Sequence, residues 1–133
     1  MRSKSLRDTY AIAREILPRG RIFALYGDLG AGKTAFVAGM AEALGIRERI
    51  LSPTFTLMRR YGNFIHIDAY RLHGPEDLAL LGWNDLVRDS RNVIVVEWAD
   101  RVESALPRDV IRVRFTHVSD HERTIDIEDP CPR

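Results

Sequence analysis

Residues 27–34 read Gly27-Asp28-Leu29-Gly30-Ala31-Gly32-Lys33-Thr34, which matches the pattern G-x-x-x-x-G-K-[ST] at every fixed position. The glycines let the backbone curl closely around an anion, so that several N–H groups point at it. Lys33 supplies a mobile positive charge for β- and γ-phosphates, and the hydroxyl of Thr34 is a ligand for Mg²⁺. The segment therefore predicts a loop that binds a nucleoside triphosphate.

The residues on either side of this loop provide the context that such a loop requires. Residues 22–26 form an apolar run of strand length, and residues 34–44 have a helical pattern with Phe36, Met40 and Leu44 at spacings of four. A glycine-rich turn that merely contains a lysine is the simpler alternative. The order strand, loop, helix favours the phosphate-binding interpretation, because the positive end of a following helix attracts the same anion.

Composition limits the class of protein. The chain has 133 residues, 45 % hydrophobic and 29 % charged, which predicts one soluble domain with a real core. A net charge of +1 gives no overall attraction to nucleic acid or membrane, and no apolar run approaches the roughly 18 residues of a spanning helix. The basic N-terminus has no apolar region after it, so we expect no leader peptide. A single cysteine, Cys131, excludes an internal disulfide and fits a cytoplasmic protein.

Two strand-like runs each end in an acid. Residues 64–68 end in Asp68, and residues 93–97 end in Glu97. In an α/β fold ligands bind at the carboxyl edge of the sheet, where such acids meet. A nucleotide with Mg²⁺ needs one acid near the metal and can use a second to orient the attacking water. Either acid alone could be a simple cap at a strand end, and the sequence does not decide which one touches the metal.

A loop threonine is a further candidate. Thr54 follows Pro53 in the segment after the helix at 34–44, where nucleotide switches carry a threonine that closes over Mg²⁺ and the γ-phosphate. The alternative is a threonine favoured only by its strand propensity.

The remaining patterns complete an α/β outline. Residues 5–17 read as an amphipathic helix whose start, Ser5 and Asp8, resembles a capping box. Thr9 lies in this helix, where packing is the simpler role and an approach to the nucleotide the more specific one. The apolar side of the helix is expected to contain Leu6, Tyr10, Ala13 and Leu17. The other expected elements are a strand at 56–61, short helices at 75–81 and 83–87, and a hairpin of 110–115 with 123–127.

These elements predict a single P-loop NTPase domain over residues 1–133. We expect a mostly parallel sheet flanked by helices, with an antiparallel hairpin at the C-terminal end.

Four motifs, taken in this order, resemble the bacterial TsaE family, the small ATPase of tRNA threonylcarbamoyladenosine synthesis. They are the loop at 27–34, Ser-Pro-Thr-Phe at 52–55, His-Ile-Asp-Ala-Tyr-Arg at 66–71 and Glu-Trp at 97–98. The first motif is shared with many families, whereas the other three are specific. The resemblance extends from Thr9 to Arg123.

The resemblance implies that ATP and Mg²⁺ are bound by residues 27–34 and Thr9. By similarity, Thr34 and Glu97 hold the metal, Asp68 lies near the γ-phosphate or its water, and Thr54 belongs to a switch-like loop. It also implies action on the TsaD–TsaB pair, which transfers threonylcarbamoyl to adenosine 37 of tRNAs that read ANN codons. ATP hydrolysis would reset that complex, and contact with tRNA would be indirect.

Two departures and three alternatives accompany this interpretation. The segment between the second and third motifs is short, and Ala99 stands where the family usually has proline.

A small-molecule kinase would need an acceptor pocket and a lid, for which little chain remains. A GTP switch would need an Asn-Lys-x-Asp motif, which is absent from the sequence. A partner-binding module with a structural nucleotide also fits the residues.

Overall fold

The computed structural model describes residues 1–27, 32–50, 57–120 and 122–130. The predictions for Asp28, Leu29, Gly30, Ala31, Thr54 and Cys131 lie outside the described residues.

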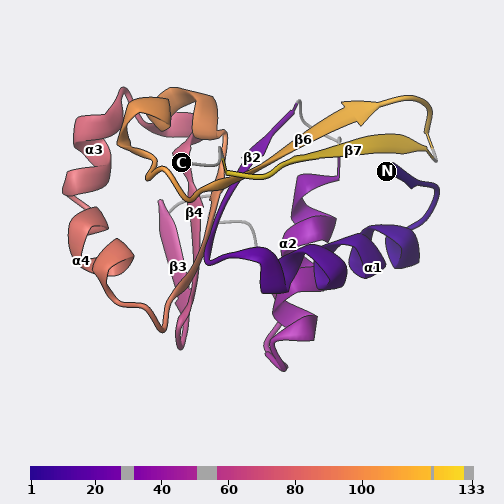
Figure 1. The fold of residues 1–133 in the computed structure, drawn as a ribbon, viewed down its shortest axis with the longest axis horizontal. Helices are drawn as coiled ribbons and strands as arrows, with labels where there is room; N and C mark the ends of the chain where they lie inside the picture. Colours follow the sequence, from indigo (N-terminus) through magenta and orange to yellow (C-terminus); the bar gives the residue numbers. More distant parts are fainter. Residues whose placement is uncertain (28–31, 51–56, 121, 131–133) are drawn as a thin grey trace.

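Seven strands form one sheet in the order β1-β7-β6-β2-β5-β4-β3 (Figure 1). The four central strands, β6, β2, β5 and β4, are mutually parallel. At one edge of the sheet β3 pairs antiparallel with β4, and at the other β7 pairs antiparallel with β6 and β1 with β7. The strands are β1 (Arg2–Ser3), β2 (Ile22–Tyr26), β3 (Met58–Tyr61), β4 (Phe64–Asp68), β5 (Val93–Glu97), β6 (Ile111–His117) and β7 (Arg123–Glu128). The predicted α/β class, with a parallel centre and a C-terminal hairpin, is confirmed.

Helices cover both faces of the sheet (Figure 1). On one face lie α1 (Leu6–Ile16) and α2 (Lys33–Ala43), and on the other lie α3 (Pro75–Ala79), α4 (Trp83–Arg88) and the 3₁₀ helix η3 (Ala99–Ala105). Two further 3₁₀ turns are η1 (Leu17–Arg19) and η2 (Ala69–Arg71). Because side chains alternate across each strand, the two faces contribute to two separate hydrophobic cores.

Helix α1 packs with a face different from the predicted one. Its buried residues are Thr9, Ile12, Ala13 and Ile16, whereas Leu6 is 63 % exposed. The predicted buried face of α1 was therefore wrong, because the observed face is shifted by about one residue along the sequence. The physical reason is the close crossing with α2, where Gly39 lies directly against Tyr10 and Ala13 and fixes the rotation of α1.

The start of α1 also differs in detail. The Ser5 hydroxyl accepts a hydrogen bond from the Asp8 N–H at 3.1 Å, as a capping box requires. The Asp8 carboxylate, however, accepts from the Lys4 N–H at 2.9 Å, one residue before the cap. The cap at Ser5 is confirmed, but the Asp8 side chain bonds to the backbone N–H of Lys4 and not to that of Ser5.

Candidate nucleotide site at the carboxyl edge of the sheet

The described ends of the loop at residues 27–34, which the sequence predicts to bind phosphate, have a backbone shape that suits glycine. Gly27 and Gly32 have φ values of 136° and 100°, which disfavour any side chain. A Cβ on Gly27 would lie 2.7 Å from the carbonyl oxygen of Phe115, and a Cβ on Gly32 would lie 2.7 Å from the Arg123 side chain. Both positions therefore need glycine, and α2 begins immediately after Gly32, so that its first N–H groups lie next to the loop.

Lys33 is the first residue of α2, and its side chain turns back toward the loop. The residue is only 5 % exposed, and Nζ donates to the carbonyl oxygen of Gly27 at 2.5 Å. Nζ also lies 3.7 Å from the centre of the Trp98 ring, within the range of a cation–π contact. Thr34, the predicted metal ligand, is exposed in the same first turn.

The two strand-end acids are neighbours. In the parallel pairing of β4 with β5, Asp68 lies opposite Glu97, so the strand spacing of about 4.8 Å separates their backbones. Phe64 and Val95 on these strands belong to the core beneath α1 and α2. Because side chains alternate, Asp68 and Glu97 lie on that same face, toward α2 and Lys33.

The environments of the two acids differ. Glu97 is buried at 4 % exposure, and its Oε2 lies 2.5 Å from Nε2 of His66. Asp68 is half-buried, and its Oδ1 accepts from the N–H of Tyr70 at 3.0 Å, so that it caps η2. The capping alternative for Asp68 is thus seen in the structure, and it leaves Oδ2 of this carboxylate for another role.

Trp98 gives the site a feature that the sequence did not predict. It is the one non-glycine residue with positive φ, 55°, in the described part of the chain. This left-handed turn directly after β5 carries the ring toward Lys33. Tyr70 packs on Trp98 at 5.0 Å between ring centres, and the Arg101 guanidinium lies 5.4 Å from the Tyr70 ring.

Of the other candidates, Thr9 stands in a packing position. It is fully buried, and its hydroxyl lies 2.6 Å from that of Ser3. Its contact with a nucleotide stays a prediction. Arg123 was not predicted to belong to the site, yet its side chain packs against Gly32, because the β6–β7 hairpin brings it there.

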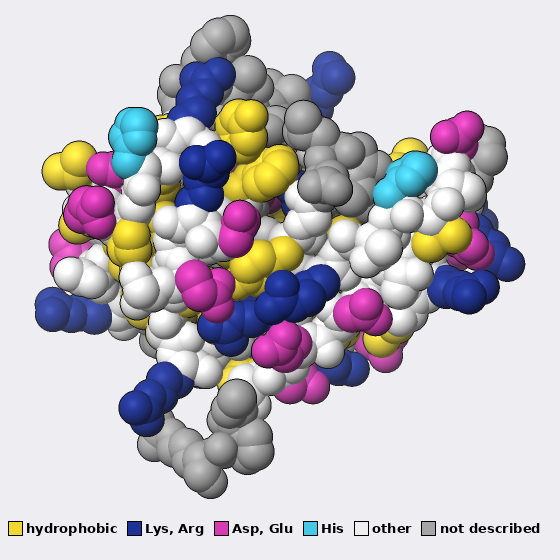
Figure 2. Space-filling model, turned by 90° about the horizontal axis from the view of Figure 1, so that it is seen from above, with side chains coloured by type: hydrophobic (Ala, Val, Ile, Leu, Met, Phe, Trp, Pro, Cys, Tyr) yellow, Lys and Arg dark blue, Asp and Glu magenta, His cyan; other side chains and the backbone are white. Residues whose placement is uncertain are grey.

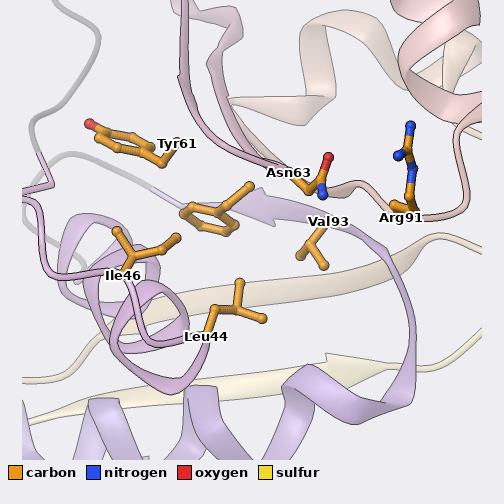
Figure 3. A pocket seen from close by; sticks show the side chains of 7 residues that line it. Leu44, Ile46, Tyr61, Asn63, Arg91 and Val93 are labelled. Carbon is orange, nitrogen blue, oxygen red and sulfur yellow. The ribbon is translucent and has the colours of Figure 1, made fainter.

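A separate hollow of about 170 Å³ lies away from these residues (Figure 3). It is lined by Leu44, Ile46, Tyr61, Asn63, Phe64, Arg91 and Val93. Phe64 and Val93 begin β4 and β5, so this hollow is at the opposite edge of the sheet from Asp68 and Glu97.

The donor set suits Mg²⁺. A threonine hydroxyl and carboxylates are hard oxygen donors, and Mg²⁺ usually binds through one or two carboxylates together with substrate phosphates. No group of three or more His, Cys, Asp or Glu side chains in the described ranges is arranged to hold a metal on its own.

The parallel sheet flanked by helices, with acids on neighbouring strands, is an α/β fold consistent with that of P-loop NTPases. The family model described as "Threonylcarbamoyl adenosine biosynthesis protein TsaE" matches residues 3–125. The chain belongs to the TsaE family.

Individual relatives agree with this membership. The TsaE protein of Treponema pallidum is 38 % identical over 131 residues, with 94 % of this chain and 96 % of the relative covered. The TsaE protein of Bacillus subtilis is 37 % identical over 132 residues, covering 93 % and 81 %. The crystal structure of YdiB from Bacillus subtilis superposes with a TM-score of 0.79 at 33 % identity, covering 98 % of this chain and 84 % of that one.

Among the described residues no helix is both long enough and apolar enough to cross a membrane.

Proposed function

We propose that this protein binds ATP with Mg²⁺ at residues 27–34 and hydrolyses the ATP to ADP and phosphate. The observation that carries the proposal is the convergence of Lys33, Asp68 and Glu97 on one face at the carboxyl edge of the sheet. Phosphoryl transfer needs positioning and charge stabilisation more than covalent chemistry, and these groups supply both.

The proposed roles follow from the position of each group. Lys33 leaves the Gly27 carbonyl and the Trp98 ring to bind the β- and γ-phosphates, while the N–H groups at the start of α2 bind the same anion. Thr34 and Glu97 hold Mg²⁺, which neutralises charge on the phosphates.

Asp68 orients the attacking water. The water oxygen forms a bond to the γ-phosphorus, and the bond to the bridging oxygen breaks, so that ADP leaves. One water proton stays on the phosphate product, and the other is released to solvent. Oδ2 of Asp68 serves this purpose, since Oδ1 is engaged by the backbone of η2. Thr54 closes over the γ-phosphate in this proposal.

Family membership supports a cellular role for this activity. We infer that the protein is the accessory ATPase of threonylcarbamoyl modification at adenosine 37 of ANN-decoding tRNAs in the cytoplasm, and that it acts on the TsaD–TsaB complex. Contact with tRNA is then indirect. On the face in Figure 2, basic and acidic side chains are interspersed, which does not favour a strong phosphate-backbone contact.

The variant Asp68→Asn tests the proposal. Asparagine still accepts from the Tyr70 N–H, so the cap of η2 survives, but the negative charge is lost. We expect the ATP affinity of Asp68→Asn to stay within about threefold of wild type, because binding depends on the loop. We expect the turnover that TsaD–TsaB stimulates to be lost, because turnover depends on the oriented water. The matched control is Asp77→Asn, since Asp77 also accepts from a backbone N–H, that of His73.

Affinity is measured by calorimetry and turnover by release of phosphate to water. If Asp68→Asn hydrolyses ATP at the wild-type rate, the role of Asp68 is wrong. If TsaD–TsaB neither binds the protein nor changes its rate, the cellular role is wrong.

A further inference from the structure

His66 is a fully buried polar side chain that the proposed hydrolysis does not use. It lies in the middle of β4, between β3 and β5, at 0 % exposure. A buried polar group is destabilising unless it is hydrogen-bonded, so an apolar residue would fill this position at lower cost. The presence of histidine here therefore calls for a specific partner.

That partner is Glu97. Nε2 of His66 lies 2.5 Å from Oε2 of Glu97, on the neighbouring strand. His66 is two residues before Asp68 in β4, so both share the face that Glu97 also occupies. The imidazole thus touches the acid that is proposed to hold the metal and lies beside the acid that is proposed to orient the water.

The other ring nitrogen defines the direction of this hydrogen bond. Nδ1 of His66 is buried and has no hydrogen-bond partner in the described part of the chain. A proton on Nδ1 would be a buried donor without an acceptor, whereas a proton on Nε2 has the Glu97 carboxylate, which only accepts, as its partner. Nε2 therefore carries the proton and donates it to the Glu97 carboxylate.

We propose that His66 is a positioning residue for the Mg²⁺ ligand Glu97. It fixes one carboxylate oxygen, Oε2, and leaves Oε1 as the oxygen that meets the metal. Hydrogen bonds of this kind hold a ligand in place before the metal arrives and typically change metal affinity 10- to 100-fold. This inference depends on the proposed function, because it assumes that Glu97 is a Mg²⁺ ligand.

Two substitutions separate positioning from simple core filling. His66→Leu places an apolar side chain of similar size at this position and removes the hydrogen-bond donor. His66→Gln keeps a donor, because its amide nitrogen reaches about as far along the side chain as Nε2 of histidine. A purely structural role predicts that leucine serves at least as well as glutamine, and a positioning role predicts the reverse.

The measured quantity is the ratio of ATP dissociation constants without and with saturating Mg²⁺, obtained by calorimetry. We expect His66→Leu to lower this ratio about 10- to 100-fold from wild type, and His66→Gln to stay within about threefold. Affinity for ATP without Mg²⁺ should be the same in all three proteins. An unchanged ratio in His66→Leu, or an equal loss in both variants, overturns the inference.

A second measurement does not need the leucine variant and decides the matter if His66→Leu does not fold. Nitrogen-15 spectra of histidine-labelled wild-type protein should show a proton on Nε2 of His66, whose signal is identified by its absence from the spectrum of His66→Gln. An unprotonated Nε2 on His66 overturns the inference. If wild-type protein binds ATP equally with and without Mg²⁺, the metal site itself is wrong, and the proposed function fails separately from the role of His66.

Discussion

Lys33 offers the most direct test of the nucleotide site. Replacing it by methionine removes the charge and keeps most of the length, whereas alanine removes the stem as well. Without nucleotide, Nζ donates to the Gly27 carbonyl at 2.5 Å and lies 3.7 Å from the Trp98 ring. In the proposed binding mode both contacts are exchanged for phosphate contacts when ATP binds. The expected loss of affinity is therefore the free energy of the phosphate contacts less that of the contacts given up.

The magnitude follows from that exchange. A hydrogen bond to a charged group is worth about 1.5–3 kcal/mol, and a contact of Lys33 with two phosphates makes more than one of them. The contacts given up include one charge-assisted bond to a carbonyl, worth about 1.5–3 kcal/mol, and a cation–π contact of about 0.5–2 kcal/mol. Two phosphate contacts of about 3–6 kcal/mol together, less these contacts, leave a net loss of about 1 kcal/mol, which corresponds to roughly fivefold weaker binding of ATP.

Calorimetric titration of ATP with Mg²⁺ measures this loss, and thermal unfolding shows that the variants are folded. We expect both Lys33→Met and Lys33→Ala to weaken binding by this factor, since the charge and not the stem makes the contact. Lys4 is the only other lysine in the sequence and is exposed, so Lys4→Met is the matched control. Wild-type affinity in Lys33→Met would refute the assignment of the loop.

Three further predictions address the metal, the pH dependence and the packing. Glu97→Gln keeps an oxygen that accepts from His66, so the melting temperature should hold while the effect of Mg²⁺ on ATP affinity falls at least about tenfold; an unchanged effect would move the metal to Asp68. Burial, together with the hydrogen bond to Glu103, raises the pKa of Tyr26 to about 12, so its stabilising contribution is present below pH 10 and is lost as pH rises toward 12. Tyr26→Phe should therefore cost about 1 kcal/mol near neutral pH, and denaturant titrations should show this difference shrinking in alkali; a constant difference contradicts it. Gly39→Ala gains about 1 kcal/mol of helix propensity but places a Cβ 2.9 Å from the backbone of α1, and such overpacking costs about 1–3 kcal/mol; a raised melting temperature would show that α1 yields.

The fold was largely predictable because its signals are local. The apolar runs that became β2, β4 and β5 and the helix after the loop follow from periodicity, and the parallel centre follows from their alternation with helices. The two-residue strand β1 gave no such signal, because it exists only through its pairing with β7. The same pairing region holds Ser3 against Thr9, so the buried face of α1 depends on contacts that the helix pattern does not contain.

The site was predictable where a general rule applied and was missed where two distant segments meet. Asp68 and Glu97 lie side by side because the carboxyl ends of parallel strands share an edge, and Lys33 begins the helix that follows β2. The contact of His66 with Glu97 joins positions 31 residues apart. Alternation along β4 did signal that His66 and Asp68 share a face, but nothing in the sequence fixes the register of β4 against β5.

The proposal gives two similar acids, Asp68 on β4 and Glu97 on β5, different roles, and their surroundings support this assignment. Asp68 and Glu97 are directly opposed, so position alone does not distinguish them. Their neighbours do: Glu97 is buried and held by His66, whereas Asp68 is half-buried and tied only to the backbone of η2. A metal ligand gains from being fixed in advance, while an acid that orients water must remain accessible to it. The environments thus favour Glu97 for Mg²⁺ and Asp68 for the water, and they require that Glu97→Gln act on metal-dependent binding while Asp68→Asn acts on turnover.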